Sequence, residues 1–128
     1  MEDIKELKDV IKDYKVMFVD DEEEIRKGTG MFLKKFFDDV TICSNGLEAL
    51  EYFKKNKNIQ IVITDIRMPK MDGMTMIKEI KKINPNIFTI FISANREAKF
   101  QDHLGDIYID KPLSYNDIVM ILNKIKEL

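Results

Sequence analysis

Short apolar runs alternate with amphipathic segments along most of this chain. Five such runs, rich in Val, Ile and aromatic residues, lie at residues 16–19, 40–43, 59–64, 87–92 and 107–109. Between them, apolar residues recur every three or four positions, which is the spacing of one face of a helix. The run at 87–92 is almost entirely apolar, as expected for a strand that helices cover on both faces. The alternation predicts an α/β fold, a doubly wound parallel sheet with right-handed crossovers.

Local signals place the ends of the predicted helices. Ser44-Asn45-Gly46 offers a turn and an N-cap before the second helix of the repeat. Asn84-Pro85 ends the third helix, because the residue before proline avoids the α region. Ser114 and Asp117 resemble a capping box in front of the last helix. The segment 95–104 has only a weak helical pattern, so we predict five helices, of which the fourth is short or displaced.

A further amphipathic segment precedes the first strand. Its apolar residues recur at helical spacing, although a five-fold β/α repeat does not need them: Ile4, Leu7, Val10, Ile11 and Tyr14. We predict an N-terminal helical extension at 1–14, followed by one domain at 15–128. The extension is expected to cap the sheet edge or a neighbouring helix. The alternative is a helix that binds a partner or a second copy of the chain, which would make a homodimer.

Composition narrows the class of protein. The chain has 128 residues, the length of one domain, and a net charge of −2 from 21 Lys and Arg against 23 Asp and Glu. That balance gives no basic field for nucleic acid, so direct nucleic-acid binding is not expected. No apolar run reaches the roughly 18 residues of a membrane span, and the start lacks the order of a signal peptide. The single cysteine, Cys43, excludes a disulfide framework, and we expect a cytoplasmic protein.

Polar side chains end four of the predicted strands. Asp20 and Asp21 follow the first strand, Asp65 the third, Ser93 the fourth and Lys111 the fifth. The carboxyl ends of parallel strands meet at one edge of a sheet, where open α/β folds bind their ligands. Each residue alone has an ordinary structural explanation, such as a helix cap or a turn. Together they predict a phosphoryl-transfer site, in which a carboxylate attacks phosphorus and a divalent cation offsets the charge.

The same residues resemble the receiver domain of two-component response regulators. The acid pair, Asp65, the run Met68-Pro69-Lys70-Met71-Asp72-Gly73, Ser93 and Lys111-Pro112 come in the family's order, and the match extends from about Lys15 to the end. The resemblance implies a flavodoxin-like sheet of five strands in the order 2-1-3-4-5. It also implies that Asp65 accepts a phosphoryl group from the phosphohistidine of a histidine kinase or phosphotransfer protein.

A Mg²⁺ site is part of what the resemblance implies. Asp21 and Asp65 would bind the ion directly, Asp20 would act mainly through water, and the backbone carbonyl of Arg67 would complete the protein ligands. This set suits Mg²⁺, which prefers six oxygen ligands and keeps several waters.

The catalytic and switching roles also follow from the resemblance. Lys111 would place its charge on the phosphoryl oxygens, and the Ser93 hydroxyl would donate a hydrogen bond to one of them. Tyr108 stands where the family has an aromatic side chain that swings inward with the hydroxyl residue, and core packing is the alternative explanation. Ser93 and Tyr108 would then form the switch. The domain would assist its own phosphorylation and dephosphorylation and would not be an enzyme.

Other functions fit parts of this pattern. A dehalogenase-type phosphatase needs a second aspartate two residues after Asp65, where this chain has Arg67. A flavodoxin-type electron carrier needs a first loop that cradles phosphate, whereas residues 20–24 are five acids. The alternative is a degenerate receiver that binds partners without phosphorylation, and the complete set of site residues argues against it. The downstream partner would be another protein or a C-terminal output domain.

Overall fold

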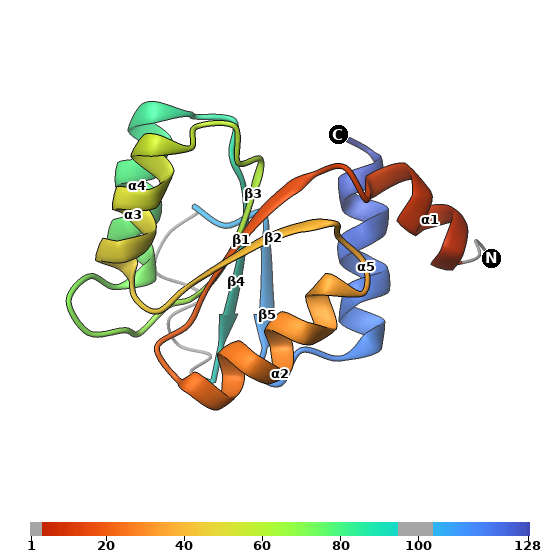
Figure 1. The fold of residues 1–128 in the computed structure, drawn as a ribbon, viewed down its shortest axis with the longest axis horizontal. Helices are drawn as coiled ribbons and strands as arrows, with labels where there is room; N and C mark the ends of the chain where they lie inside the picture. Colours follow the sequence, from red (N-terminus) through yellow and green to blue (C-terminus); the bar gives the residue numbers. More distant parts are fainter. Residues whose placement is uncertain (1–3, 95–103) are drawn as a thin grey trace.

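The computed structural model describes residues 4–94 and 104–128 of the chain. Its centre is a five-stranded parallel sheet in the order β2-β1-β3-β4-β5 (Figure 1). This arrangement confirms the predicted doubly wound sheet and its strand order. The strands are β1 (Lys15–Val19), β2 (Asp39–Cys43), β3 (Ile61–Asp65), β4 (Phe88–Ser93) and β5 (Ile107–Asp110).

Helices cover both faces of the sheet. α2 (Glu23–Lys34) and α5 (Tyr115–Lys126) lie on one face, and α3 (Gly46–Lys55) and α4 (Gly73–Ile83) lie on the other (Figure 1). The short helix expected between β4 and β5 falls on residues 95–104, and all of these except Leu104 lie outside the described residues. Within the part of the chain that the structure describes, no helix has the length and apolar character needed to cross a membrane.

Side chains alternate along the strands and divide the core into two layers. In β1, Val16 and Phe18 belong to the layer under α2 and α5, whereas Met17 and Val19 belong to the layer under α3 and α4. β3 and β4 are buried along their whole length. Because both faces of these central strands are covered, their sequences are mostly apolar and do not alternate with exposed polar residues.

Three helix ends lie where the sequence predicts them. Asn45 Oδ1 accepts a backbone N–H of the first turn of α3 at 2.8 Å. Ser114 and Asp117 form a reciprocal capping box at the start of α5. α4 ends at Ile83, before Pro85. These caps satisfy backbone groups that a helix end leaves without an internal partner.

The N-terminal segment forms α1 (Ile4–Ile11), which packs against α5 (Figure 1). Leu7 and Ile11 are fully buried in the layer that α2 and α5 cover. The N–H of Asp38 donates to the carbonyl of Lys12 at 3.1 Å, which connects the end of α1 to the start of β2. Val10 was expected on the same apolar stripe, but it is 58% exposed, because the contact with α5 is narrower than the stripe. The segment therefore packs on a neighbouring helix.

Candidate functional site

The acid pair lies directly after β1. Asp20 continues the sheet by one residue, because its N–H donates to the carbonyl of Cys43 at 3.2 Å. Its side chain is buried, with the residue only 1% exposed, and Oδ1 accepts the N–H of Glu22 at 2.9 Å. Asp21 is more accessible than Asp20. The loop therefore holds one acid inside the protein and leaves its neighbour nearer to solvent.

Asp65 is the last residue of β3 and is 7% exposed. Its Oδ1 accepts the N–H of Ile66 at 2.7 Å, and its Oδ2 accepts a hydrogen bond from Lys111 Nζ at 2.9 Å. Burial is the largest influence and raises the pKa of Asp65, as does the charge of Asp20, whereas the hydrogen bond and charge of Lys111 lower it. The pKa of this carboxyl is therefore raised above its ordinary value of 3.8.

Lys111 follows β5 and contacts two acids from other strands. Its Nζ lies 2.9 Å from Asp65 Oδ2 and 3.0 Å from Asp20 Oδ2. Burial alone would lower the pKa of Lys111, but hydrogen bonds and charges from the two carboxylates outweigh burial and raise it. One ammonium thus connects residues that follow or end β1, β3 and β5.

Five of the predicted site residues line one cavity of about 210 Å³. They are Asp21, Asp65, Arg67, Ser93 and Lys111. Ser93 is the buried last residue of β4, and its carbonyl accepts the N–H of Lys111 at 3.1 Å. The space exceeds the roughly 30 Å³ that one liquid water occupies, so it has room for a small polar group with waters. With Glu22, which also lines it, three carboxylates, a hydroxyl and an ammonium therefore surround one cavity.

Asp20 contacts Lys111 but does not line the 210 Å³ cavity. It lines a neighbouring cavity of about 200 Å³ between α2 and the residues after β5, whose other lining residues are mainly apolar. Its Oδ2 is buried and, among the described residues, has only the ion-pair contact with Lys111 and no well-aligned hydrogen bond. This oxygen is therefore able to accept a further partner.

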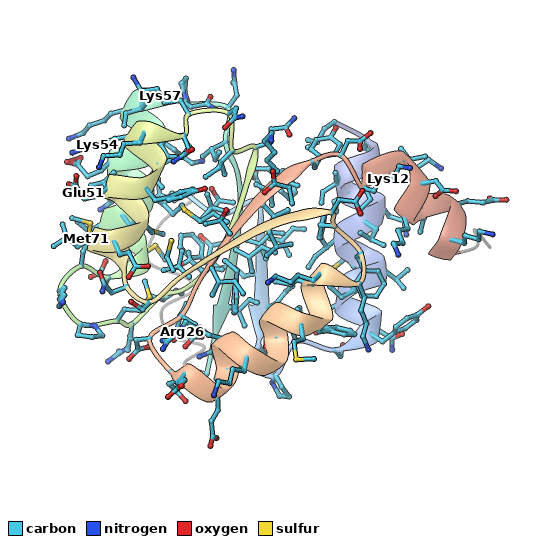
Figure 2. The ribbon with its side chains drawn as sticks, in the orientation of Figure 1. Lys12, Arg26, Glu51, Lys54, Lys57 and Met71 are labelled. Carbon is cyan, nitrogen blue, oxygen red and sulfur yellow. The ribbon has the colours of Figure 1, made fainter. Side chains whose placement is uncertain are left out.

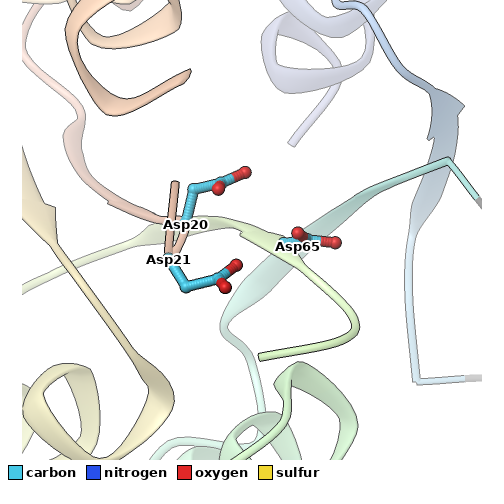
Figure 3. Close-up of side chains that lie close together, drawn as sticks. All are labelled: Asp20, Asp21 and Asp65. Atoms are coloured by element: carbon cyan, nitrogen blue, oxygen red, sulfur yellow. The ribbon is translucent and has the colours of Figure 1, made fainter. Parts of the chain in front are cut away.

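Carboxylate oxygens from three residues lie close enough to share a cation. One oxygen each from Asp20, Asp21 and Asp65 lies within 4.8 Å of the others (Figure 3). Charged oxygen donors are the ligands that Mg²⁺ prefers. The incompletely bonded Asp20 Oδ2 and this donor set fit such an ion, so the cluster is compatible with the Mg²⁺ that the sequence predicts.

A tight loop after β3 forms one wall of the site. Lys70 has left-handed backbone geometry, with φ of 70°, and the N–H of Met71 donates to the carbonyl of Pro69 at 2.8 Å, which is the hydrogen bond of a γ-turn. A Cβ atom on Gly73 would lie 2.1 Å from the carbonyl oxygen of Asp65. Only glycine therefore lets α4 begin so close to the end of β3.

Tyr108, the predicted switch residue, lies on β5 apart from the residues that line the 210 Å³ cavity. Its ring stacks on Phe91 with 5.4 Å between the ring centroids. Its hydroxyl accepts the N–H of Gly105 at 3.2 Å. In this structure the tyrosine is thus a packing residue of the layer under α3 and α4.

Arg26 contacts the acid loop, although no motif in the sequence predicted a role for it at the site. Its Nη1 donates to the backbone carbonyl of Asp20 at 2.9 Å. Arg26 lies near the start of α2, at the positive end of the helix dipole, where acids are favoured and cations are not. That unfavourable placement is the signal in the sequence that could have identified it.

Comparison with known proteins gives a family. The chain matches the model of the response regulator receiver domain over residues 16–123. It is 32% identical over 117 residues to the sensor kinase CckA of Brucella abortus, and the match covers 88% of this chain and 12% of CckA. It is also 32% identical over 117 residues to the response regulator RR06 of Streptococcus pneumoniae, covering 88% of this chain and 52% of RR06. The chain thus spans about half of one relative and a small part of the other.

Solved structures agree with this result. A response regulator receiver domain protein of Clostridium thermocellum is 30% identical, with a TM-score of 0.76 and coverage of 89% of this chain and 94% of that one. CheY in a complex of CheX, CheY, BeF₃ and Mg²⁺ from Borrelia burgdorferi provides a second likeness, with 31% identity, a TM-score of 0.74 and 88% coverage of both chains. With a matching sequence model, fold and acid cluster, the chain belongs to the response regulator receiver domain family.

Proposed function

We propose that this chain is a phosphoacceptor switch of a two-component system, in which Asp65 takes a phosphoryl group from a phosphohistidine. The observation that carries the proposal is the ammonium of Lys111 in contact with the buried carboxylates of both Asp20 and Asp65. The ammonium and the Ser93 hydroxyl that line the same cavity can donate to phosphoryl oxygens, and a divalent cation held by the acids would offset the negative charge. Family membership supports the two-component role in general.

In the proposed reaction, a carboxylate oxygen of Asp65 attacks phosphorus. The new O–P bond forms as the P–N bond of the phosphohistidine breaks, and the imidazole leaves with the bonding electron pair. Asp21 and Asp65 would hold Mg²⁺ directly, Asp20 mainly through water, and Arg67 through its backbone carbonyl. The ion would offset the negative charge that the carboxylates share with the phosphoryl oxygens.

The remaining site residues would act by position and charge. Lys111 lines the same cavity as Asp65, so a small movement from Asp65 Oδ2 would bring its ammonium to the phosphoryl oxygens. The Ser93 hydroxyl would donate a hydrogen bond to one of those oxygens, and Tyr108 would move inward with it. No general base is needed, so the domain would be a phosphoacceptor that assists its own reaction rather than an enzyme.

The partners follow from the same role. A histidine kinase or a phosphotransfer protein would supply the phosphoryl group, and the likeness to a sensor kinase and a response regulator supports this pairing in general. The phosphorylated domain would act on a downstream protein or on an attached output domain. We place this signalling in the cytoplasm, without direct nucleic-acid contact by this domain, and a homodimer is a further state to examine.

Phosphorylation by a small donor tests the proposal. The chain is incubated with acetyl phosphate, with and without Mg²⁺, and the intact protein is weighed. We expect one phosphoryl adduct that requires Mg²⁺ and that disappears in the Asp65→Asn variant. Asp72→Asn is the matched control, because Asp72 lies on the same loop but caps α4, and asparagine caps helices as well as aspartate does.

An adduct on wild type and Asp72→Asn alone would support the proposal. No adduct and no Mg²⁺ binding by calorimetry would instead favour the alternative, a receiver that binds its partners without phosphorylation. An adduct that persists in Asp65→Asn would mean that another residue accepts the phosphoryl group.

A further inference from the structure

The side chain of Arg26 joins the start of α2 to the end of β1. Its Nη1 donates to the backbone carbonyl of Asp20 at 2.9 Å, in a partly buried setting. Figure 2 labels Arg26 at that end of α2. The hydrogen bond spans the short loop that carries the acid pair, so it fixes the distance between the two ends of that loop.

Three hydrogen bonds hold the backbone and Oδ1 of Asp20, in addition to the ion pair of its Oδ2 with Lys111. Its N–H donates to the carbonyl of Cys43 at 3.2 Å, its Oδ1 accepts the N–H of Glu22 at 2.9 Å, and its carbonyl accepts from Arg26. The first two bonds have backbone donors. Arg26 supplies the one side-chain donor of the three, and its bond is therefore the one that a substitution at the donor removes.

We propose that Arg26 is a positioning residue for the Mg²⁺ site, which holds the carbonyl of Asp20 and thereby keeps the acids of this loop in the arrangement that binds the ion. This inference rests on the proposed function. A loop that is already fixed needs less ordering when a ligand binds, so preorganisation strengthens binding. The guanidinium charge acts in the opposite direction, because a nearby cation repels Mg²⁺. Removing the guanidinium should therefore weaken Mg²⁺ binding if positioning dominates, and strengthen it if charge repulsion dominates.

Lys27 provides a matched control. It is the next residue on α2 and carries the same charge, but its side chain is 74% exposed and pairs with Glu23 at 3.2 Å on the surface. Lys27→Ala removes one positive charge from the same helical turn without removing the bond to Asp20. Arg26→Lys keeps the charge and one flexible donor, but loses the planar fork of the guanidinium.

Two measurements on the whole chain test the role. Calorimetry gives the dissociation constant of Mg²⁺ and needs no tryptophan fluorescence, which this chain lacks. Incubation with acetyl phosphate gives the phosphorylation rate as a function of Mg²⁺ concentration. For Arg26→Ala we expect about a tenfold weaker Mg²⁺ affinity, equivalent to about 1.4 kcal/mol. The Mg²⁺ concentration for half-maximal rate should rise by the same factor, whereas the rate at saturating Mg²⁺ should change less. Arg26→Lys should be intermediate, and Lys27→Ala should resemble wild type.

Other outcomes would overturn the inference. Tighter Mg²⁺ binding by Arg26→Ala, or equal shifts in Arg26→Ala and Lys27→Ala, would show that charge decides. A rate lost at every Mg²⁺ concentration with an unchanged dissociation constant would indicate less folded protein, not a displaced acid loop. If Arg26→Ala does not fold, Arg26→Lys replaces it in the test. An Mg²⁺ affinity of Arg26→Lys equal to that of wild type would then contradict the inference. A wild type that neither binds Mg²⁺ nor is phosphorylated would overturn the proposed function as well.

Discussion

The site contains buried charges, whose removal from water is unfavourable. The residues present neutralise these charges only in part. One ammonium contacts two buried carboxylates, so the buried group carries a surplus negative charge before Asp21 is counted. Desolvated charges are costly unless they are compensated. This surplus agrees with the raised pKa of Asp65 beside a cationic partner. It is also the charge that a bound divalent cation would offset.

Cys43 gives a pH prediction at the scale of one residue. Burial first, and then the charge and hydrogen bond of Glu48, raise the pKa of this thiol from 9.0 to about 12. Between these values the folded protein keeps the proton while the unfolded chain loses it, so stability falls as the pH rises. From pH 9 to 10.5, wild type should lose about 1.5 kcal/mol more unfolding free energy than Cys43→Ala. Urea unfolding at several pH values measures this difference.

The comparison with Cys43→Ala removes the contributions of lysines and tyrosines that titrate in the same range. Because the substitution itself leaves a cavity, only the slopes against pH are compared, not the stabilities at one pH. Parallel slopes for the two proteins would mean that the thiol ionises without hindrance in the folded state.

Single residues also differ in how far the sequence could predict them. Asp65 ends one strand and Lys111 follows another, so their meeting at one edge of a parallel sheet follows from the strand pattern. Arg26 could not be placed in this way, because its contact depends on how the loop after β1 folds back. The position of the Tyr108 ring could not be predicted either, since its stacking on Phe91 is a contact between two strands.

At the scale of elements, apolar runs marked the strands but not their ends. The run at 59–64 predicted a strand there, whereas β3 covers Ile61–Asp65. β4 begins and ends one residue later than the run at 87–92. Apolar runs in the sequence indicate which residues are buried, whereas the ends of a strand depend on backbone hydrogen bonds to neighbouring strands. Ile59 is buried, yet its N–H bonds to Asn56 in the preceding turn. As a result Asp65 is a strand residue, held by the sheet rather than by a loop.

α1 gives a prediction about an element. Leu7 is 1% exposed in the layer beneath α2 and α5, whereas Val10 lies on the solvent side of the same helix. Leu7→Ala should lower the unfolding free energy by about 2–5 kcal/mol, because it leaves a cavity in the core. Val10→Ala should change it by less than about 0.5 kcal/mol. Urea unfolding of the two variants gives both values.

Phosphorylation of Asp65 in folded Leu7→Ala should be close to that of wild type, since α1 lies where the strands begin and the acids lie where they end. Equal stabilities of the Leu7 and Val10 variants would show that α1 is not docked on α5 in solution.

At the scale of the whole molecule, the acid cluster couples distant parts of the chain. Its residues follow or end β1 and β3, and Lys111 extends the contacts to β5. The apolar runs predicted a doubly wound parallel sheet, and the resemblance implied the strand order that the structure has. The segment between β4 and β5, where the sequence pattern was weak, lies largely outside the described residues.

Mg²⁺ should therefore stabilise the whole domain. An ion that binds only the folded chain adds about 2.7 kcal/mol at a concentration 100 times its dissociation constant, and the melting temperature should rise by several degrees. Asp21→Asn should remove most of this rise, and excess EDTA should reverse it in wild type. A scanning calorimeter measures each case. An equal rise in Asp21→Asn would place the stabilising ion elsewhere on the protein.

The packing of α1 on α5 has a consequence for how this domain can be joined to something else. α1 meets α5 near the start of β1 (Figure 1), whereas the acids follow β1 or end β3, at the opposite ends of these strands. A five-residue strand spans roughly 17 Å, so cargo tethered beside α1 or the last turn of α5 stands about that far from Asp65. A fluorescent reporter attached there would leave the 210 Å³ cavity open, so a change in its signal on phosphorylation would report a change that crosses the sheet.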